Sequence, residues 1–107
     1  MNDLVEAIGQ RIAQKRLRIS RHAQKRLLER RIRIGDLLDS VETWRVIEEY
    51  PDGRMGPALL ALHVLPSGPV HAVWGMFRPD AQNAVLVTVY LPDEENWDGD
   101  FRTRRKT

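Results

Sequence analysis

Three side chains in this sequence have the types that acid–base chemistry on RNA requires. His22 lies in a basic segment, SRHAQKRLLERRI, while His71 and Tyr90 lie in two segments rich in β-forming residues. RNA cleavage without a metal needs a base for the 2′-OH proton, an acid for the leaving 5′-oxygen, and a cation beside the phosphorane. His71 or His22 could act as the base, and Tyr90 or the other histidine as the acid. Arg26 or Arg30 could supply the cation.

Each of these residues also has a structural interpretation. A histidine in a strand commonly makes hydrogen bonds that hold the fold, and a histidine at a helix start commonly caps local backbone or is simply solvated. Tyr90 lies between Val89 and Leu91, which favours a packed ring with a satisfied hydroxyl. The residues alone therefore leave catalysis and structure open for His22, His71 and Tyr90.

Positive charge is concentrated in the first third of the chain. Residues 1–33 hold ten Lys/Arg and three Asp/Glu, which gives a net charge of +7. Residues 34–101 hold three Lys/Arg and twelve Asp/Glu, which gives a net charge of −9. Residues 102–107 add four cations. A segregated basic face attracts polyanions such as RNA or DNA, although the charges could also merely solvate two surfaces. Phosphate contacts need only exposure and charge. The predicted nucleic-acid contacts are Arg21, Lys25, Arg30, Arg31 and Arg33.

Several other chemistries lack the residues they need. The chain has no cysteine, which excludes disulfides, thiolate nucleophiles and sulfur ligands for zinc. Its three histidines are scattered, with no HExxH or phosphate-binding glycine motif, so we expect no metal and no cofactor. No apolar run approaches the roughly 20 residues of a membrane span, and the first 16 residues are too charged for a signal peptide. A cytoplasmic protein without membrane contact is expected.

Helical periodicity positions the basic residues. The apolar spacing predicts three helices, over about residues 2–15, 20–31 and 36–41. Ser20 is the predicted cap of the second helix, whose two faces follow from about 100° of rotation per residue. The apolar face is formed by Ala23, Leu27, Leu28 and Ile32, and the other face carries a stripe of His22, Arg26 and Arg30.

From Trp44 onward the apolar period changes to two, which is typical of strands. Segments 44–50, 58–65, 70–77 and 83–91 are rich in β-forming residues, and the turn sequences PDGRMGP, PSGP and PDAQ separate them. We expect an α+β domain with two to three N-terminal helices packed on one face of a four-stranded antiparallel sheet. A single domain over residues 1–97 is expected, with a polar, mobile tail over 98–107.

Turn lengths predict which side chains of the sheet meet. If PSGP closes the hairpin between the second and third strands, His71 faces Val64, and if PDAQ closes the next hairpin, His71 faces Tyr90. Directly opposed residues share a face. His71, Thr88 and Tyr90 would then form a polar cluster, with His63 pointing to the other face.

Four segments carry a family resemblance: SRHAQKRLLERRI, VIEEYPDGRMGPALLAL, VHAVWG and VTVYLPDEENW. Their specificity comes from order, with Ser-x-His-Ala and a downstream Arg, then a Tyr-Pro turn, a strand His, and Thr-x-Tyr-x-Pro before Trp. Together they resemble the domain of unknown function 4258 family over about residues 18–97.

The resemblance implies a small bacterial protein with a RelE-like fold, related to RelE-like and barnase/EndoU-like ribonuclease toxins. Such proteins are often encoded beside a zinc-finger antitoxin of the MqsA type. The matching positions would be His22, Arg26, Arg30, His71, Thr88 and Tyr90. The expected function is a metal-independent endoribonuclease of a toxin–antitoxin module, leaving 2′,3′-cyclic phosphate ends. The alternative is a non-catalytic RNA-binding or protein-binding module that uses the basic helix 21–33.

Two departures from the family pattern affect the helices. Arg31 and Arg33 stand where the family usually has a helix-ending Gly and a capping Ser or Thr, so we expect tertiary contacts rather than local caps to shape residues 32–35. The N-terminal helix, within residues 1–16, lies outside the family core. We expect this helix to form the contact in a homodimer or to bind an antitoxin.

Overall fold

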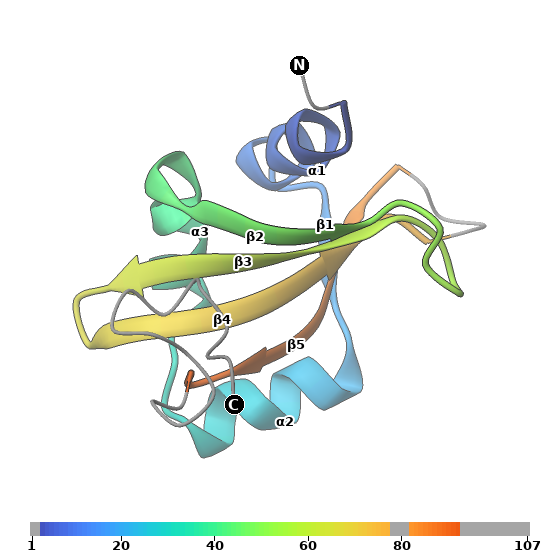
Figure 1. The fold of residues 1–107 in the computed structure, drawn as a ribbon. Coiled ribbons are helices and arrows are strands. Elements are labelled where there is room, and N and C mark those ends of the chain that lie inside the picture. The colour runs from blue at the N-terminus through green and yellow to red at the C-terminus, as the bar shows by residue number, and fades with distance from the viewer. Residues whose placement is uncertain (1–2, 78–81, 93–107) are drawn as a thin grey trace, which may run out of the picture.

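The computed structural model describes residues 3–77 and 82–92, and these form three α-helices and one sheet (Figure 1). The helices are α1 (Asp3–Ala13), α2 (Arg21–Glu29) and α3 (Ile34–Asp39), the last continued by the 3₁₀ turn η1 (Ser40–Thr43). The strands are β1 (Leu17–Ile19), β2 (Arg45–Tyr50), β3 (Ala58–Leu65), β4 (Gly68–Gly75) and β5 (Ala84–Tyr90). The α+β class is confirmed.

The sheet corrects the prediction of four antiparallel strands. It has five strands in the order β1-β5-β4-β3-β2. The last four pair antiparallel as expected, whereas β1 adds to β5 in parallel, from Leu17 opposite Ala84 to Ile19 opposite Leu86. A three-residue strand is too short to show a period of two, and its partner lies far along the chain. Local pattern therefore did not reveal β1.

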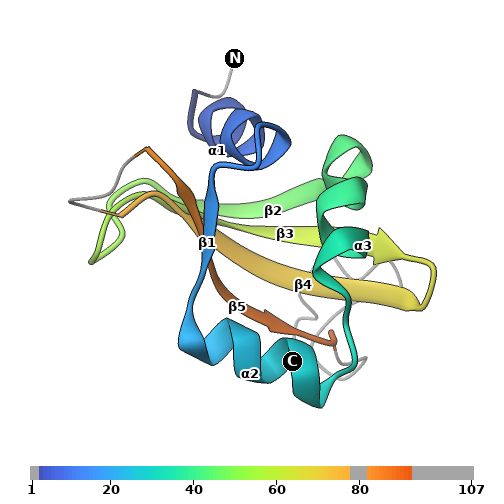
Figure 2. The same ribbon diagram turned by 180° about the vertical axis from the view of Figure 1, so that it is seen from behind.

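All three α-helices pack on one face of the sheet, as predicted. Helix α1 lies toward the β2 side of the sheet and α2 toward the β5 side (Figure 2). The core-facing helix residues are Ile8, Ile12, Ala23, Leu27 and Leu37, and the strand residues that they join include Leu59, Ala61, Ala72, Trp74, Leu86 and Val89. The buried apolar residues of α1, Ile8 and Ile12, thus belong to the core of the domain. Its role in a homodimer or in antitoxin binding stays a prediction.

One residue of the predicted apolar face of α2 is not in the core. Leu28 is 81% exposed, whereas Ala23 and Leu27 are buried. Leu28 lies about 100° further around the helix than Leu27, which carries it past the contact with the sheet. The apolar face of α2 is therefore narrower than predicted.

The β3–β4 hairpin has a tighter turn than predicted. Leu65 pairs with Gly68, so His71 lies opposite Leu62 and not opposite Val64. Gly68 has a φ of 129°, a conformation that side chains disfavour and glycine adopts readily, which lets the chain reverse through two residues.

The β4–β5 register agrees with the prediction at the candidate site. His71 pairs with Tyr90, and Val73 pairs with Thr88. The next pair is Trp74 with Leu86, so Val87 is an extra, bulged residue of β5.

The remaining predictions concern the C-terminal tail and membrane-spanning helices. The predicted tail, residues 98–107, lies outside the described residues, as does the predicted domain boundary at Trp97. Among the helices of the described part, none has the length and apolar composition needed to cross a bilayer.

Candidate functional site

Ser20 is the N-cap of α2, as predicted, and its side chain also bonds the helix to the sheet. Its Oγ accepts a hydrogen bond from the backbone N–H of Ala23 at 2.9 Å and donates one to the carbonyl of Val87 at 2.8 Å. Val87 is the bulged residue of β5, so α2 is attached where that strand is irregular. The basic helix is therefore held beside β5 (Figure 1).

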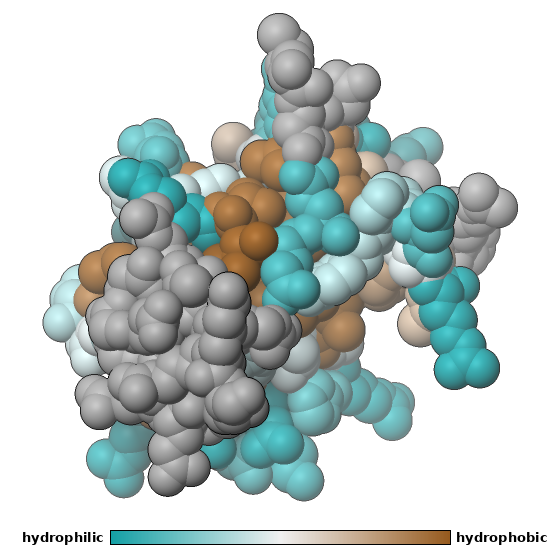
Figure 3. Space-filling view, in the orientation of Figure 1, coloured by the Kyte–Doolittle hydropathy of each residue, from teal (hydrophilic) through white to brown (hydrophobic). Residues whose placement is uncertain are grey.

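The outward side of α2 and the link to α3 carry unpaired cations. We call this set the basic surface; it consists of Arg21, Lys25, Arg30, Arg31 and Arg33, all exposed. Within residues 3–77 and 82–92, none of the five makes an ion pair. Figure 3 shows hydrophilic residues along the border of the molecule where α2 lies.

Arg26 differs from the cations of the basic surface. Its side chain is 40% exposed, and its Nη1 lies 3.4 Å from Oε1 of Glu29, the one acid in α2. An exposed pair of this kind contributes little to stability. It does, however, give Arg26 a partner inside its own helix, which weakens its case as a catalytic cation.

His22 is exposed in the first turn of α2. Among the described residues its side chain makes no hydrogen bond, ion pair or ring contact. The capping position is filled by Ser20. Of the structural interpretations of His22, solvation of the helix start therefore fits the geometry, and capping does not.

His71 and Tyr90 form a contacting pair on neighbouring strands. His71 Nδ1 and the Tyr90 hydroxyl oxygen are 3.3 Å apart, and the two rings meet edge to face with centroids 5.3 Å apart. His71 is fully buried, and Tyr90 is half-buried. Thr88 shares their face, because it pairs with Val73 two residues before Tyr90. The register thus yields the predicted polar cluster.

The helices and the His71–Tyr90 pair lie on opposite faces of the sheet. Ala72 points into the core with Ala23 and Leu27 of α2, so its neighbour His71 points away from them. In the part of the chain that the structure describes, no hydrogen bond or ring contact joins His22 or Arg26 to His71. The structure brings together the strand members of the predicted catalytic set and separates them from the helix members.

His63 is a buried histidine on the core face of β3, which is the face opposite His71, as the register predicts. The indole N–H of Trp74 donates to His63 Nε2 at 3.1 Å, so Nε2 carries no proton. Nδ1 must then hold the proton, and it lies 2.8 Å from the hydroxyl of Ser40, which in turn donates to the carbonyl of Leu37. Burial lowers the pKa of His63 to about 4. This neutral ring links α3 and η1 to the sheet.

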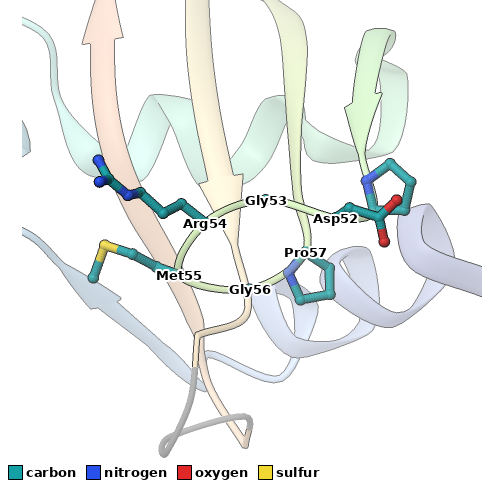
Figure 4. Close-up of a pocket in the computed structure, with 7 residues that line it drawn as sticks. Asp52, Gly53, Arg54, Met55, Gly56 and Pro57 are labelled. Carbon is teal, nitrogen blue, oxygen red and sulfur yellow. The ribbon is translucent and has the colours of Figure 1, made fainter.

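Two surface hollows lie away from the candidate residues. One, of about 320 Å³, is enclosed by the loop 51–57 (Figure 4), and the other, of about 450 Å³, lies between the end of α1 and the α3–η1 segment. Neither is lined by a residue of the predicted site. Among the described residues, no group of three His, Asp or Glu side chains could hold a metal ion.

The 51–57 loop depends on a glycine. Gly56 has a φ of 140°, and a Cβ there would lie 2.5 Å from the carbonyl oxygen of Met76. Gly56→Ala is therefore expected to lower the free energy of unfolding by about 1–3 kcal/mol, measured by urea denaturation. Gly35→Ala is the matched control, because a Cβ on Gly35 in α3 meets nothing within 4 Å. It should raise stability by about 0.5–1 kcal/mol, and equal effects of the two changes would contradict the loop geometry.

The fold and the site define a small α+β domain in which a basic helix is fastened beside β5 of a mixed sheet. The chain belongs to the family described as domain of unknown function (DUF4258), whose model matches residues 19–91. This match confirms the family resemblance and runs from the end of β1 to just beyond β5, with α1 outside it. No curated protein and no solved structure gives a significant match.

Proposed function

We propose that this protein binds RNA through the basic surface of α2 and the link that follows it. The observation that carries the proposal is the presence of five exposed cations without ion pairs on one helix and its C-terminal link, among the described residues. Phosphate oxygens take most of the hydrogen bonds in protein–nucleic acid complexes, and exposed Arg and Lys are their usual partners. The charge of the basic surface is therefore available to an external polyanion.

The placement of charge along α2 supports the same proposal. The first turn of the helix has no acid and begins with Arg21. The N-terminal end of a helix dipole is positive, so an acid there stabilises the helix and a cation does not. A cation at this position favours a role outside folding.

The choice of RNA rests on the sequence resemblance. We propose that the domain is related to RelE-like and barnase/EndoU-like ribonuclease toxins and shares a RelE-like fold. Contacts to phosphate alone would also suit DNA. The choice of RNA over DNA therefore rests on the proposed relationship to ribonucleases. The choice of contact residues rests on the basic surface.

A titration with a labelled single-stranded RNA of mixed sequence tests the proposal. At about 50 mM salt we expect a dissociation constant of roughly 10⁻⁶ to 10⁻⁴ M or tighter, followed by fluorescence anisotropy. A peptide nucleic acid of the same base sequence is the matched control, because it keeps the bases and lacks the phosphates. Binding of the control as tight as that of RNA, or no binding of RNA, would contradict a phosphate-binding surface.

A second candidate function is the metal-independent endoribonuclease of a toxin–antitoxin module, with a zinc-finger antitoxin of the MqsA type as its partner. The His71–Tyr90 pair favours it, since an imidazole and a phenol 3.3 Å apart can act as base and acid. On this hypothesis RNA must reach the sheet face opposite the helices, where His71 is buried. The basic surface lies on the other side, so RNA binding has the stronger support.

Cleavage of RNA by the purified protein in chelator decides between the two candidates. If the second holds, products end in 2′,3′-cyclic phosphates and His71→Ala slows cleavage by about 10²-fold or more. His22→Ala is the matched control and should cleave normally, because His22 makes no contact with the pair among the described residues. Intact RNA with binding retained would leave RNA binding as the function.

A further inference from the structure

Arg31 ends α2 in a conformation that favours glycine. Its φ is 54°, in the left-handed region. The N–H of Ile32 donates to the carbonyl of Leu27 at 2.9 Å, and the N–H of Arg31 donates to the carbonyl of Leu28 at 3.2 Å. These two bonds define a helix end whose left-handed residue is usually glycine. A side chain at that position destabilises the helix end.

Arg33 also occupies a position that favours another residue type. It is the N-cap of α3, with extended backbone and no side-chain hydrogen bond to the helix. Ser, Thr, Asp and Asn are preferred at such a position because their side chains accept bonds from the free N–H groups of the first turn. Both capping positions of the α2–α3 link are therefore filled by arginine at a cost in stability.

We infer that Arg30, Arg31 and Arg33 form an arginine cluster that binds phosphates of the RNA backbone. The inference deepens the proposed function and rests on it. All three side chains are exposed, and in the described part of the chain none makes an ion pair or a side-chain hydrogen bond. Guanidinium groups bind phosphate bidentately, which makes arginine the residue of choice for this contact. Residues held in disfavoured conformations concentrate at functional sites.

The end of α1 provides an internal comparison. Lys15 has a φ of 60°, and the N–H groups of Lys15 and Arg16 donate to the carbonyls of Ile12 and Arg11 at 2.9 and 2.8 Å. The backbone motif is the same, but Lys15 lines a hollow together with Asp39 and Glu42. Carboxylates beside Lys15 make its surroundings unfavourable for phosphate. The left-handed conformation alone therefore does not mark a binding site.

The test uses the double variant Arg31→Gly/Arg33→Ser, with Lys15→Gly as the matched control. The double variant removes two cations and Lys15→Gly removes one, and each variant relieves a left-handed helix end. The double variant should melt about 4 °C or more above the wild-type protein. Its affinity for single-stranded RNA at about 0.1 M salt should fall roughly 10- to 30-fold, and its salt slope should be smaller by about 1.4. Lys15→Gly should also melt higher, with RNA affinity unchanged.

Four results would overturn the inference. If the double variant binds RNA as tightly as the wild-type protein, the cluster does not hold phosphate. If Lys15→Gly weakens binding about 5-fold, which is the loss expected for each cation of the double variant, the effect comes from net charge. If the melting temperature of the double variant does not rise, the arginines do not lower stability. If the wild-type protein fails to bind RNA at all, the proposed function fails together with the cluster, whereas the first three results leave RNA binding by the wild-type protein intact.

Discussion

The double substitution Arg21→Glu/Lys25→Glu is expected to weaken RNA binding about 100-fold at roughly 0.1 M salt, because each lost phosphate contact lowers affinity about 5-fold and the new acids repel the backbone. Both side chains are exposed on α2 and have no partner among the described residues. Folding should be unaffected, since an acid at the first helical position suits the helix dipole. Anisotropy titrations give the affinities, and circular dichroism confirms the fold.

The matched control is Arg45→Glu/Arg54→Glu. It changes the net charge of the protein by the same amount, but these exposed arginines lie on β2 and in the loop 51–57. Strand β2 is at the opposite edge of the sheet from β1, whereas α2 packs against β5, the neighbour of β1 (Figure 1). The control should bind RNA within a few-fold of the wild-type protein. Equal losses in the two double variants would show that overall charge, and not the α2 surface, governs binding.

Acidification from pH 7 to pH 4 is expected to reduce the free energy of unfolding by about 3 kcal/mol through His63 alone, given a pKa of about 4 in the folded protein against 6.5 unfolded. Between these values the unfolded chain binds more protons than the folded one. The contribution of His63 is therefore fully present above pH 6.5 and is lost as the pH falls toward 4. A proton on Nε2 would face the N–H of Trp74, which leaves two donors opposed.

Urea denaturation at several pH values measures this effect, and His63→Gln isolates it. The variant should be less stable than the wild-type protein at pH 7, because it loses the ring contacts with Trp44 and Trp74. Its stability should then fall less between pH 6.5 and 4. A profile for His63→Gln parallel to that of the wild-type protein would contradict a neutral, buried His63.

The elements with long, clear periodicity could be predicted from the sequence. Strand β3 begins at Ala58 and ends at Leu65, as expected, because eight residues of β-forming sequence lie between two turns. Strand β1 was missed because three residues carry no period, and only pairing with β5 defines it. The end of α2 also differs from the prediction. Without a glycine at residue 31 a local cap was not expected, yet Arg31 adopts the left-handed conformation that forms one.

Side-chain neighbours within the sheet were more predictable than neighbours between layers. The pairing of His71 with Tyr90 follows from strand register, which turn sequences constrain. Which side of the sheet the helices cover is a tertiary property, so the separation of His22 from His71 could not be foreseen. The contact between His63 and Ser40 joins η1 to β3 across 23 residues. No local pattern marks it.

The salt dependence of RNA affinity in the wild-type protein tests binding by the basic surface most directly. If all five cations contact phosphates, log K should fall linearly with log salt, with a slope of about −3.5 between roughly 50 and 200 mM. The slope should become smaller by about 0.7 for each cation of the basic surface that is neutralised. A slope near zero, or an affinity that does not respond to these cations, would contradict the assignment of α2 and its link as the RNA-binding surface.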